Sequence, residues 1–270
     1  MPFLKPLAKA EFYRYFCLML NHIIFDTPSD HPTLLIVHGL YGSARNWGVI
    51  AKRLSDSHRV IAVDQRNHGE SPWYDSHTYF DMADDLEKVI RAQGAPMDVV
   101  GHSMGGKAAM ILALQHPELV NRLIVADIAP VAYAHDQRQY IQAMKAVDLT
   151  KIEKRSEASA ELSKTVPDPT LQSFFTQSLD LQARRWRLNL DVLERDMHHI
   201  VGFPEISGST FEKPTLFLTG AQSHYVTHEH RPRIKDLFPN AKFAKIPNVG
   251  HWLHAEAPRP FEETVRMFFN

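Results

Sequence analysis

Short apolar runs, often β-branched, recur along the chain and alternate with longer segments whose apolar residues recur at helical spacing. Apolar runs bounded by turn residues predict buried strands, and the amphipathic segments predict helices. The expected strands span residues 20–25, 34–37, 60–63, 97–100, 123–126, 215–219 and 242–246. The expected helices span residues 46–54, 78–93, 107–115 and 229–238, and a last helix follows Pro258. This alternation predicts an α/β fold with a mostly parallel, doubly wound sheet covered by helices on both faces.

The alternation stops between Ala129 and Lys213, where the segment is polar and helix-like and is interrupted by prolines. We interpret residues 130–213 as a helical cap inserted at the carboxyl edge of the sheet, where ligands of open α/β sheets bind. Residues 19–129 and 214–270 are then expected to form the core domain. Residues 1–18 are expected to form an N-terminal extension.

A serine lies between two glycines at the boundary between a predicted strand and a predicted helix, in the sequence Gly101-His102-Ser103-Met104-Gly105. This spacing is typical of a nucleophile elbow, a sharp and strained turn that needs small flanking residues. The turn exposes the hydroxyl group at a helix N-terminus, where backbone N–H groups favour developing negative charge. Ser103 is therefore the predicted nucleophile.

A serine hydroxyl needs a base to accept its proton, and sixteen histidines are available. His251 is the predicted base because it follows the strand at residues 242–246 through a short link. It also comes late in the chain, after the serine, which is the order found in enzymes with a nucleophile elbow. His38 and His102 flank the expected site and are predicted to have structural roles.

The acidic partner of the histidine is not at the position usual for enzymes with a nucleophile elbow. The loop after the strand at residues 215–219, where an aspartate is normally found, carries Ser223 instead. A serine hydroxyl can hold the histidine tautomer but cannot offset the imidazolium charge. Asp127 ends the strand next to the nucleophile strand, so its side chain should reach the same edge of the sheet. We predict Asp127 as the acid and Ser223 as an auxiliary residue.

The oxyanion hole should combine one N–H from the residue after the nucleophile with one from a loop after an early strand. Met104 supplies the first of these groups. The glycines of His38-Gly39-Leu40-Tyr41-Gly42 allow the close backbone approach that the second requires, and Leu40 is the predicted donor.

From about Met19 to the C-terminus, the chain resembles the α/β-hydrolases, and more narrowly the small bacterial esterases of the YbfF type and related abhydrolase proteins. The resemblance rests on residues 38–43, 64–72, 101–107, 127–130, 199–202, 223–226 and 250–252. It implies hydrolysis of esters, including acyl-CoA thioesters as an alternative. It also implies that Ser103 is the nucleophile, His251 the base and Asp127 the displaced acid, with Ser223 assisting.

Charge and composition narrow the partners further. The chain has 30 basic and 31 acidic residues without a long run of one sign, which argues against nucleic acid and favours a small neutral ligand. The single cysteine, Cys17, excludes an internal disulfide and suits the cytoplasm. No stretch reaches the roughly 20 apolar residues of a membrane span. We expect no secretory signal in residues 1–18, because charged residues interrupt their apolar groups. A transit peptide, a surface-binding helix or a start at Met19 stay open.

The predicted activity is a cofactor-independent serine carboxylesterase that forms a serine-bound acyl intermediate. An acyl-CoA thioesterase is the first alternative, for which Arg184, Arg185 and Arg187 of the cap could bind phosphates. A non-catalytic ligand-binding protein is the second. A metal site at His224, His228 and His230 is the weaker interpretation of that segment because no fourth ligand is evident, so no metal is expected. The acyl-chain length and the oligomeric state stay open.

Overall fold

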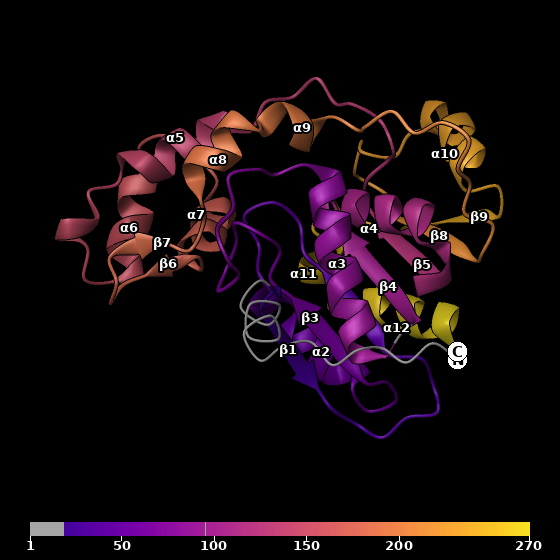
Figure 1. Ribbon diagram of the computed structural model, residues 1–270. Helices are drawn as coiled ribbons and strands as arrows, with labels where there is room; N and C mark the ends of the chain where they lie inside the picture. The colour runs from indigo at the N-terminus through magenta and orange to yellow at the C-terminus, as the bar shows by residue number, and fades with distance from the viewer. Residues whose placement is uncertain (1–18, 95) are drawn as a thin grey trace.

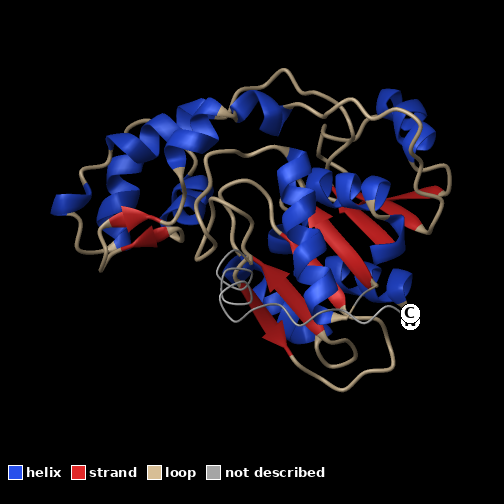
Figure 2. Ribbon diagram, viewed as in Figure 1, coloured by secondary structure: helices blue, strands red, loops and turns tan. Residues whose placement is uncertain are grey.

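The computed structural model describes residues 19–94 and 96–270 and is built around a seven-stranded sheet (Figures 1 and 2). The strand order is β1-β3-β2-β4-β5-β8-β9, with β1 antiparallel to β3 at one edge and the other neighbours parallel. The strands are His22–Phe25 (β1), Leu34–Val37 (β2), Val60–Val63 (β3), Met97–His102 (β4), Val120–Ala126 (β5), Thr215–Gly220 (β8) and Ala241–Ile246 (β9). The predicted α/β class and mostly parallel sheet are confirmed.

Helices cover both faces of the sheet. On one face lie α3 (Tyr79–Gln93), α4 (Met104–Gln115) and α10 (Arg231–Leu237). On the other lie α2 (Gly48–Leu54), α11 (Leu253–Glu256) and α12 (Pro258–Phe269). Short 3-10 turns are Ala44–Trp47 (η1), Pro117–Leu119 (η2), Leu149–Lys151 (η3) and His228–His230 (η4). The sheet thus has an apolar core on each side.

Local sequence explains why α3 begins and ends where it does. The Thr78 hydroxyl accepts the Asp81 N–H, and the Asp81 carboxylate accepts the Thr78 N–H in return. At the other end Gly94 has φ +86°, a left-handed conformation that favours glycine. The helix is therefore fixed at both ends by side chains and turn residues that the sequence specifies.

Residues 130–213 lie above and to one side of the sheet in Figure 1. Their helices are Arg138–Ala146 (α5), Arg155–Leu162 (α6), Pro169–Thr176 (α7), Leu190–Arg195 (α8) and Met197–Val201 (α9). The segment also contains a small antiparallel pair, Leu179–Asp180 (β6) and Arg185–Trp186 (β7). Because each of these strands has only two residues, neither leaves an alternating pattern in the sequence. The division into core and cap stays a prediction.

The parallel register aligns the carboxyl ends of three neighbouring strands. His102 of β4 lies opposite Ala126 of β5, and Ala126 lies opposite Leu218 of β8. Residues that directly follow β4, β5 and β8 therefore meet at one edge of the sheet. No helix in the described ranges 19–94 and 96–270 is long and apolar enough to cross a membrane. The predicted extension at residues 1–18 lies outside the described residues.

Candidate active site

Ser103 lies on the sharp turn between β4 and α4. Its backbone has φ 53° and ψ −121°, a strained conformation for a residue other than glycine. A Cβ atom at Gly105 would lie 2.4 Å from the carbonyl oxygens of Val37 and His38, and one at Gly101 would lie 2.4 Å from the Gly105 oxygen. The two glycines are therefore required sterically for β4, α4 and the loop after β2 to approach each other.

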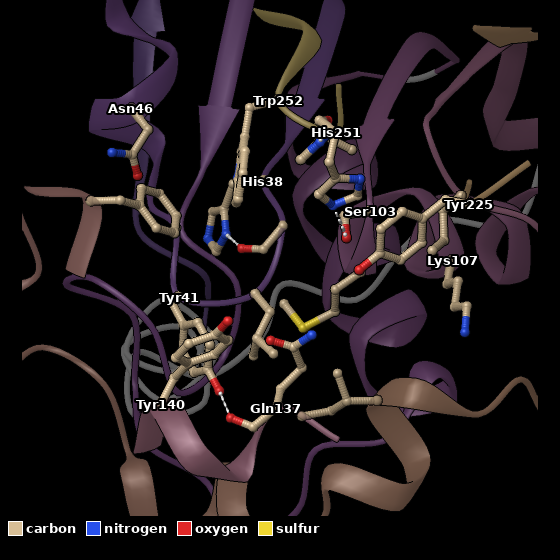
Figure 3. Close-up of a pocket in the computed structure, with 18 of the residues that line it drawn as sticks. His38, Tyr41, Asn46, Ser103, Lys107, Gln137, Tyr140, Tyr225, His251 and Trp252 are labelled. Atoms are coloured by element: carbon tan, nitrogen blue, oxygen red, sulfur yellow. Dashed lines mark hydrogen bonds between the residues drawn. The ribbon is translucent and has the colours of Figure 1, made fainter. Parts of the chain in front are cut away.

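Three predicted residues form one hydrogen-bonded chain. His251 Nε2 lies 3.1 Å from the Ser103 Oγ (Figure 3). His251 Nδ1 lies 2.7 Å from the Asp127 Oδ2. The Asp127 side chain is fully buried, whereas that of His251 is 16% exposed. When the Nδ1 proton is donated to Asp127, the Nε2 lone pair faces the hydroxyl of Ser103. This is the arrangement of a nucleophile, a base and an orienting acid.

Asp127 receives hydrogen bonds from three directions. In addition to His251, the Ser223 hydroxyl donates to the Oδ2 atom at 2.5 Å, and the Gly220 N–H donates to Oδ1 at 3.2 Å. The Tyr225 N–H in turn donates to the Ser223 Oγ at 3.2 Å. The Asp127 carboxylate, which comes from the end of β5, therefore contacts the loop after β8. That loop is the one in which an aspartate is usual and Ser223 is found.

The loop after β2 is held in place by residues that follow β3. The Gln65 side-chain amide donates to the His38 carbonyl at 2.8 Å, and the Gln65 N–H donates to His38 Nε2 at 2.9 Å. The Tyr41 N–H donates to His68 Nε2 at 3.2 Å. Within the described chain, neither the Leu40 N–H nor the Met104 N–H has a hydrogen-bond acceptor.

Two further residues position His251, and sequence reasoning assigned no such role to either of them. The Tyr225 ring stacks on the imidazole with centroids 4.1 Å apart, and the two residues lie side by side in Figure 3. His102 Nε2 donates to the His251 carbonyl at 2.9 Å, which fixes the backbone of the histidine. Tyr225 lies two residues after Ser223, but only the tertiary fold shows that it reaches the imidazole.

A cavity of about 250 Å³ opens beside Ser103 and His251. Residues of the core and of the 130–213 segment line it together. Apolar side chains supply much of the wall, among them Leu40, Ile128, Leu171, Phe174, Ile200 and Val201. An apolar cavity with a few polar groups at one place is the usual form of a small-molecule site.

The three histidines of the weaker metal-site alternative lie on different elements. His224 lies in the loop after β8, whereas His228 and His230 lie in η4, so they do not share a helical face. In residues 19–94 and 96–270, the one grouping with potential metal-ligand spacing is Asp84, Glu87 and His116, at the protein surface. Exposed acidic groups of this kind are common without a metal ion.

The arginines that the thioesterase alternative could use to bind phosphates have other partners. Arg187 pairs with Glu70 at 2.6 Å and with Asp180 at 3.1 Å, and Arg185 lies over the Trp73 ring. The Arg184 guanidinium donates to the Thr150 carbonyl. None of the three lines the cavity. The expectation that they could form an entrance for a phosphate-bearing substrate gains no support from their positions.

The fold and this arrangement of serine, histidine and aspartate define an α/β-hydrolase. The family model described as alpha/beta hydrolase fold matches residues 32–258, and the chain belongs to this family.

Several known proteins are similar to this chain over most of their length. The mouse protein named sn-1-specific diacylglycerol lipase ABHD11 is 38% identical, with 93% of this chain and 85% of the relative covered. Esterase YbfF of Escherichia coli is 36% identical, with 89% and 94% covered. A solved structure titled marine microorganism esterase has a TM-score of 0.88 and 37% identity, with 93% and 99% covered.

Proposed function

We propose that this protein is a serine carboxylesterase that cleaves esters of apolar acyl groups. The observation that carries the proposal is the chain of hydrogen bonds from Ser103 through His251 to Asp127 beside an apolar cavity. The names of the relatives, a lipase and two esterases, agree with this chemistry.

The proposed reaction has two halves. In the first, His251 Nε2 accepts the Ser103 proton while the Oγ attacks the acyl carbonyl, and the imidazolium then protonates the departing alkoxide. In the second, His251 accepts a proton from water as the water attacks the acyl-serine, and the imidazolium returns a proton to the Ser103 Oγ as the carboxylic acid leaves. Asp127 stays ionised throughout and stabilises the imidazolium that forms in each half.

Negative charge develops on the carbonyl oxygen during each attack. We assign the N–H groups of Leu40 and Met104 as the donors that bind this oxygen. Both are free of other acceptors in the described chain, and Met104 begins α4, where the first N–H groups have no intrahelical partner. Removing one such donor typically costs about 10²- to 10³-fold in kcat, so the shape of the loop after β2 matters for the rate.

A fluorophosphonate probe tests the proposed function directly, because it reacts with an activated serine and not with an ordinary hydroxyl group. We expect one label per chain, located at Ser103 by mass spectrometry, and hydrolysis of p-nitrophenyl esters by the same sample. Folded protein that is neither labelled at Ser103 nor active on any ester would contradict the proposal and favour a non-catalytic ligand-binding protein. Acyl-CoA thioesters in the same panel test the thioesterase alternative.

We expect Ser223→Ala to lower kcat by about tenfold or less. The change removes one hydrogen bond to the carboxylate, for which the expected contribution is about 1.5 kcal/mol. The Gly220 N–H still holds Asp127 Oδ1, and the link from Oδ2 to His251 is unchanged. The measurement is kcat for a p-nitrophenyl ester at saturating substrate. A loss equal to that of an Asp127 variant would show that Ser223 has the larger part in orienting His251.

A further inference from the structure

Lys107 is a buried cation that the proposed reaction does not use. Lys107 lies on α4, one helical turn after Ser103. It is 1% exposed and lines the cavity. Its Nζ donates to the Val201 carbonyl at 3.0 Å and to the Gly202 carbonyl at 2.5 Å. In Figure 3 the amine end points away from Ser103 and His251. Its role therefore concerns the wall of the cavity and not the proton transfers.

Burying the amine of this lysine costs desolvation free energy. Burial lowers its pKa to about 7, and no carboxylate of the described chain pairs with it. The amine also lies 4.7 Å from the centroid of the Tyr133 ring, which offers a partial electrostatic compensation. An apolar side chain of similar length would fill the same space without this desolvation penalty. The compensating contacts are therefore the two carbonyl groups that it binds.

These carbonyls belong to the end of α9, where a helix leaves its last carbonyl groups without intrahelical donors. Two more donors reach the same turn, Tyr79 from the core and Tyr133 from the 130–213 segment itself. The Tyr79 hydroxyl donates to the Ile200 carbonyl at 2.6 Å, and the Tyr133 N–H donates to the Val201 carbonyl at 3.0 Å. Three consecutive carbonyls, of residues 200–202, are thus held by Tyr79, Lys107 and Tyr133. We call this set the α9 clamp.

The α9 clamp is part of the cavity wall. Tyr79, Lys107 and Tyr133 line the cavity, and so do Ile200 and Val201, whose carbonyls they hold. The hydrogen bonds that attach this turn to the core therefore also fix where the two apolar side chains lie.

We propose that Lys107 is a specificity-determining residue: by clamping α9 to the core it fixes the wall against which longer acyl chains pack. This inference rests on the proposed esterase function. An acetyl or butyryl group has few methylene groups with which to contact the cavity wall. A longer chain must also contact the cavity wall, and it binds more tightly when that wall is already ordered, because less conformational entropy is lost on binding.

The test compares Lys107→Met with the unchanged protein on p-nitrophenyl esters from acetate to laurate. Methionine keeps an unbranched side chain only one atom shorter and removes the donors. We expect the ratio of kcat/KM for the laurate ester to that for the butyrate ester to fall about three- to tenfold, as expected for the loss of one or two hydrogen bonds. The fall should appear in KM for the long ester, because Lys107 does not touch the reacting atoms.

Two further variants make the result specific. Tyr79→Phe removes only the hydroxyl that donates to the Ile200 carbonyl, and we expect a smaller change of the ratio in the same direction. Lys52→Met makes the same substitution at an exposed position of α2, and we expect no change in the ratio. Hydrogen exchange of the peptide covering residues 197–204 should be faster in Lys107→Met than in either the unchanged protein or Lys52→Met.

The outcomes separate this inference from the function on which it rests. If the unchanged protein is neither labelled by the fluorophosphonate nor active on esters, the proposed function fails. If it is active but a folded Lys107→Met protein and Tyr79→Phe both keep the original ratio, the role of the α9 clamp in specificity is wrong. An equal loss on acetate and laurate through kcat would likewise overturn it, since that pattern would indicate a disturbed elbow.

Discussion

Ser103→Ala is expected to lower kcat for ester hydrolysis by about 10⁶-fold, the scale measured when a triad serine is removed from a serine hydrolase. The variant has no atom that can form the acyl intermediate, so only transition-state binding by the oxyanion donors would be left. The measurement is a rate with a p-nitrophenyl ester at high enzyme concentration, together with loss of fluorophosphonate labelling.

The matched control is Ser156→Ala, which changes an exposed serine of α6 in the same way. Its kcat and its labelling should equal those of the unchanged protein. Activity of Ser103→Ala within tenfold of the unchanged protein would rule out Ser103 as the nucleophile, and the cavity would then have to act through another group.

Asp127→Asn is expected to lower kcat by about 10⁴-fold, the cost of this substitution in a known triad. The physical reason lies in the hydrogen bonds around the carboxylate. The Gly220 N–H donates to Oδ1, so the asparagine carbonyl oxygen is favoured at that position. The amide NH₂ then occupies the place of Oδ2 and faces His251 Nδ1. The imidazole must accept there, which moves its proton to Nε2 and removes the base from Ser103.

Asp236→Asn provides the control, because Asp236 is an exposed residue of α10. We expect it to be fully active. The comparison with Ser223→Ala ranks the two residues: a large loss for Asp127→Asn and a small loss for Ser223→Ala support Asp127 as the acid. Near-normal activity of Asp127→Asn in a folded protein would remove Asp127 from the mechanism.

Local sequence patterns predicted most of the fold. The apolar runs identified all seven strands of the main sheet within a few residues. The signal is strongest for β2 and β3, which are apolar and buried over their whole length. The pair β6 and β7 was missed because two residues give no periodic signal. The contacts of the loop after β3 gave no local signal either: Arg66 pairs with Asp85 at 2.6 Å, and Asp64 accepts the Ala44 N–H.

The sequence by itself determined the elbow, since the glycines around Ser103 are demanded by backbone contacts that any residue with a Cβ would violate. It also determined the parallel sheet, because strand and helix alternate along the chain. Only the tertiary structure decided how Tyr225, His102 and Lys107 are used. Their contacts join residues that are far apart in the chain, such as Lys107 and Gly202, and no local pattern records a distance between segments that meet only after folding.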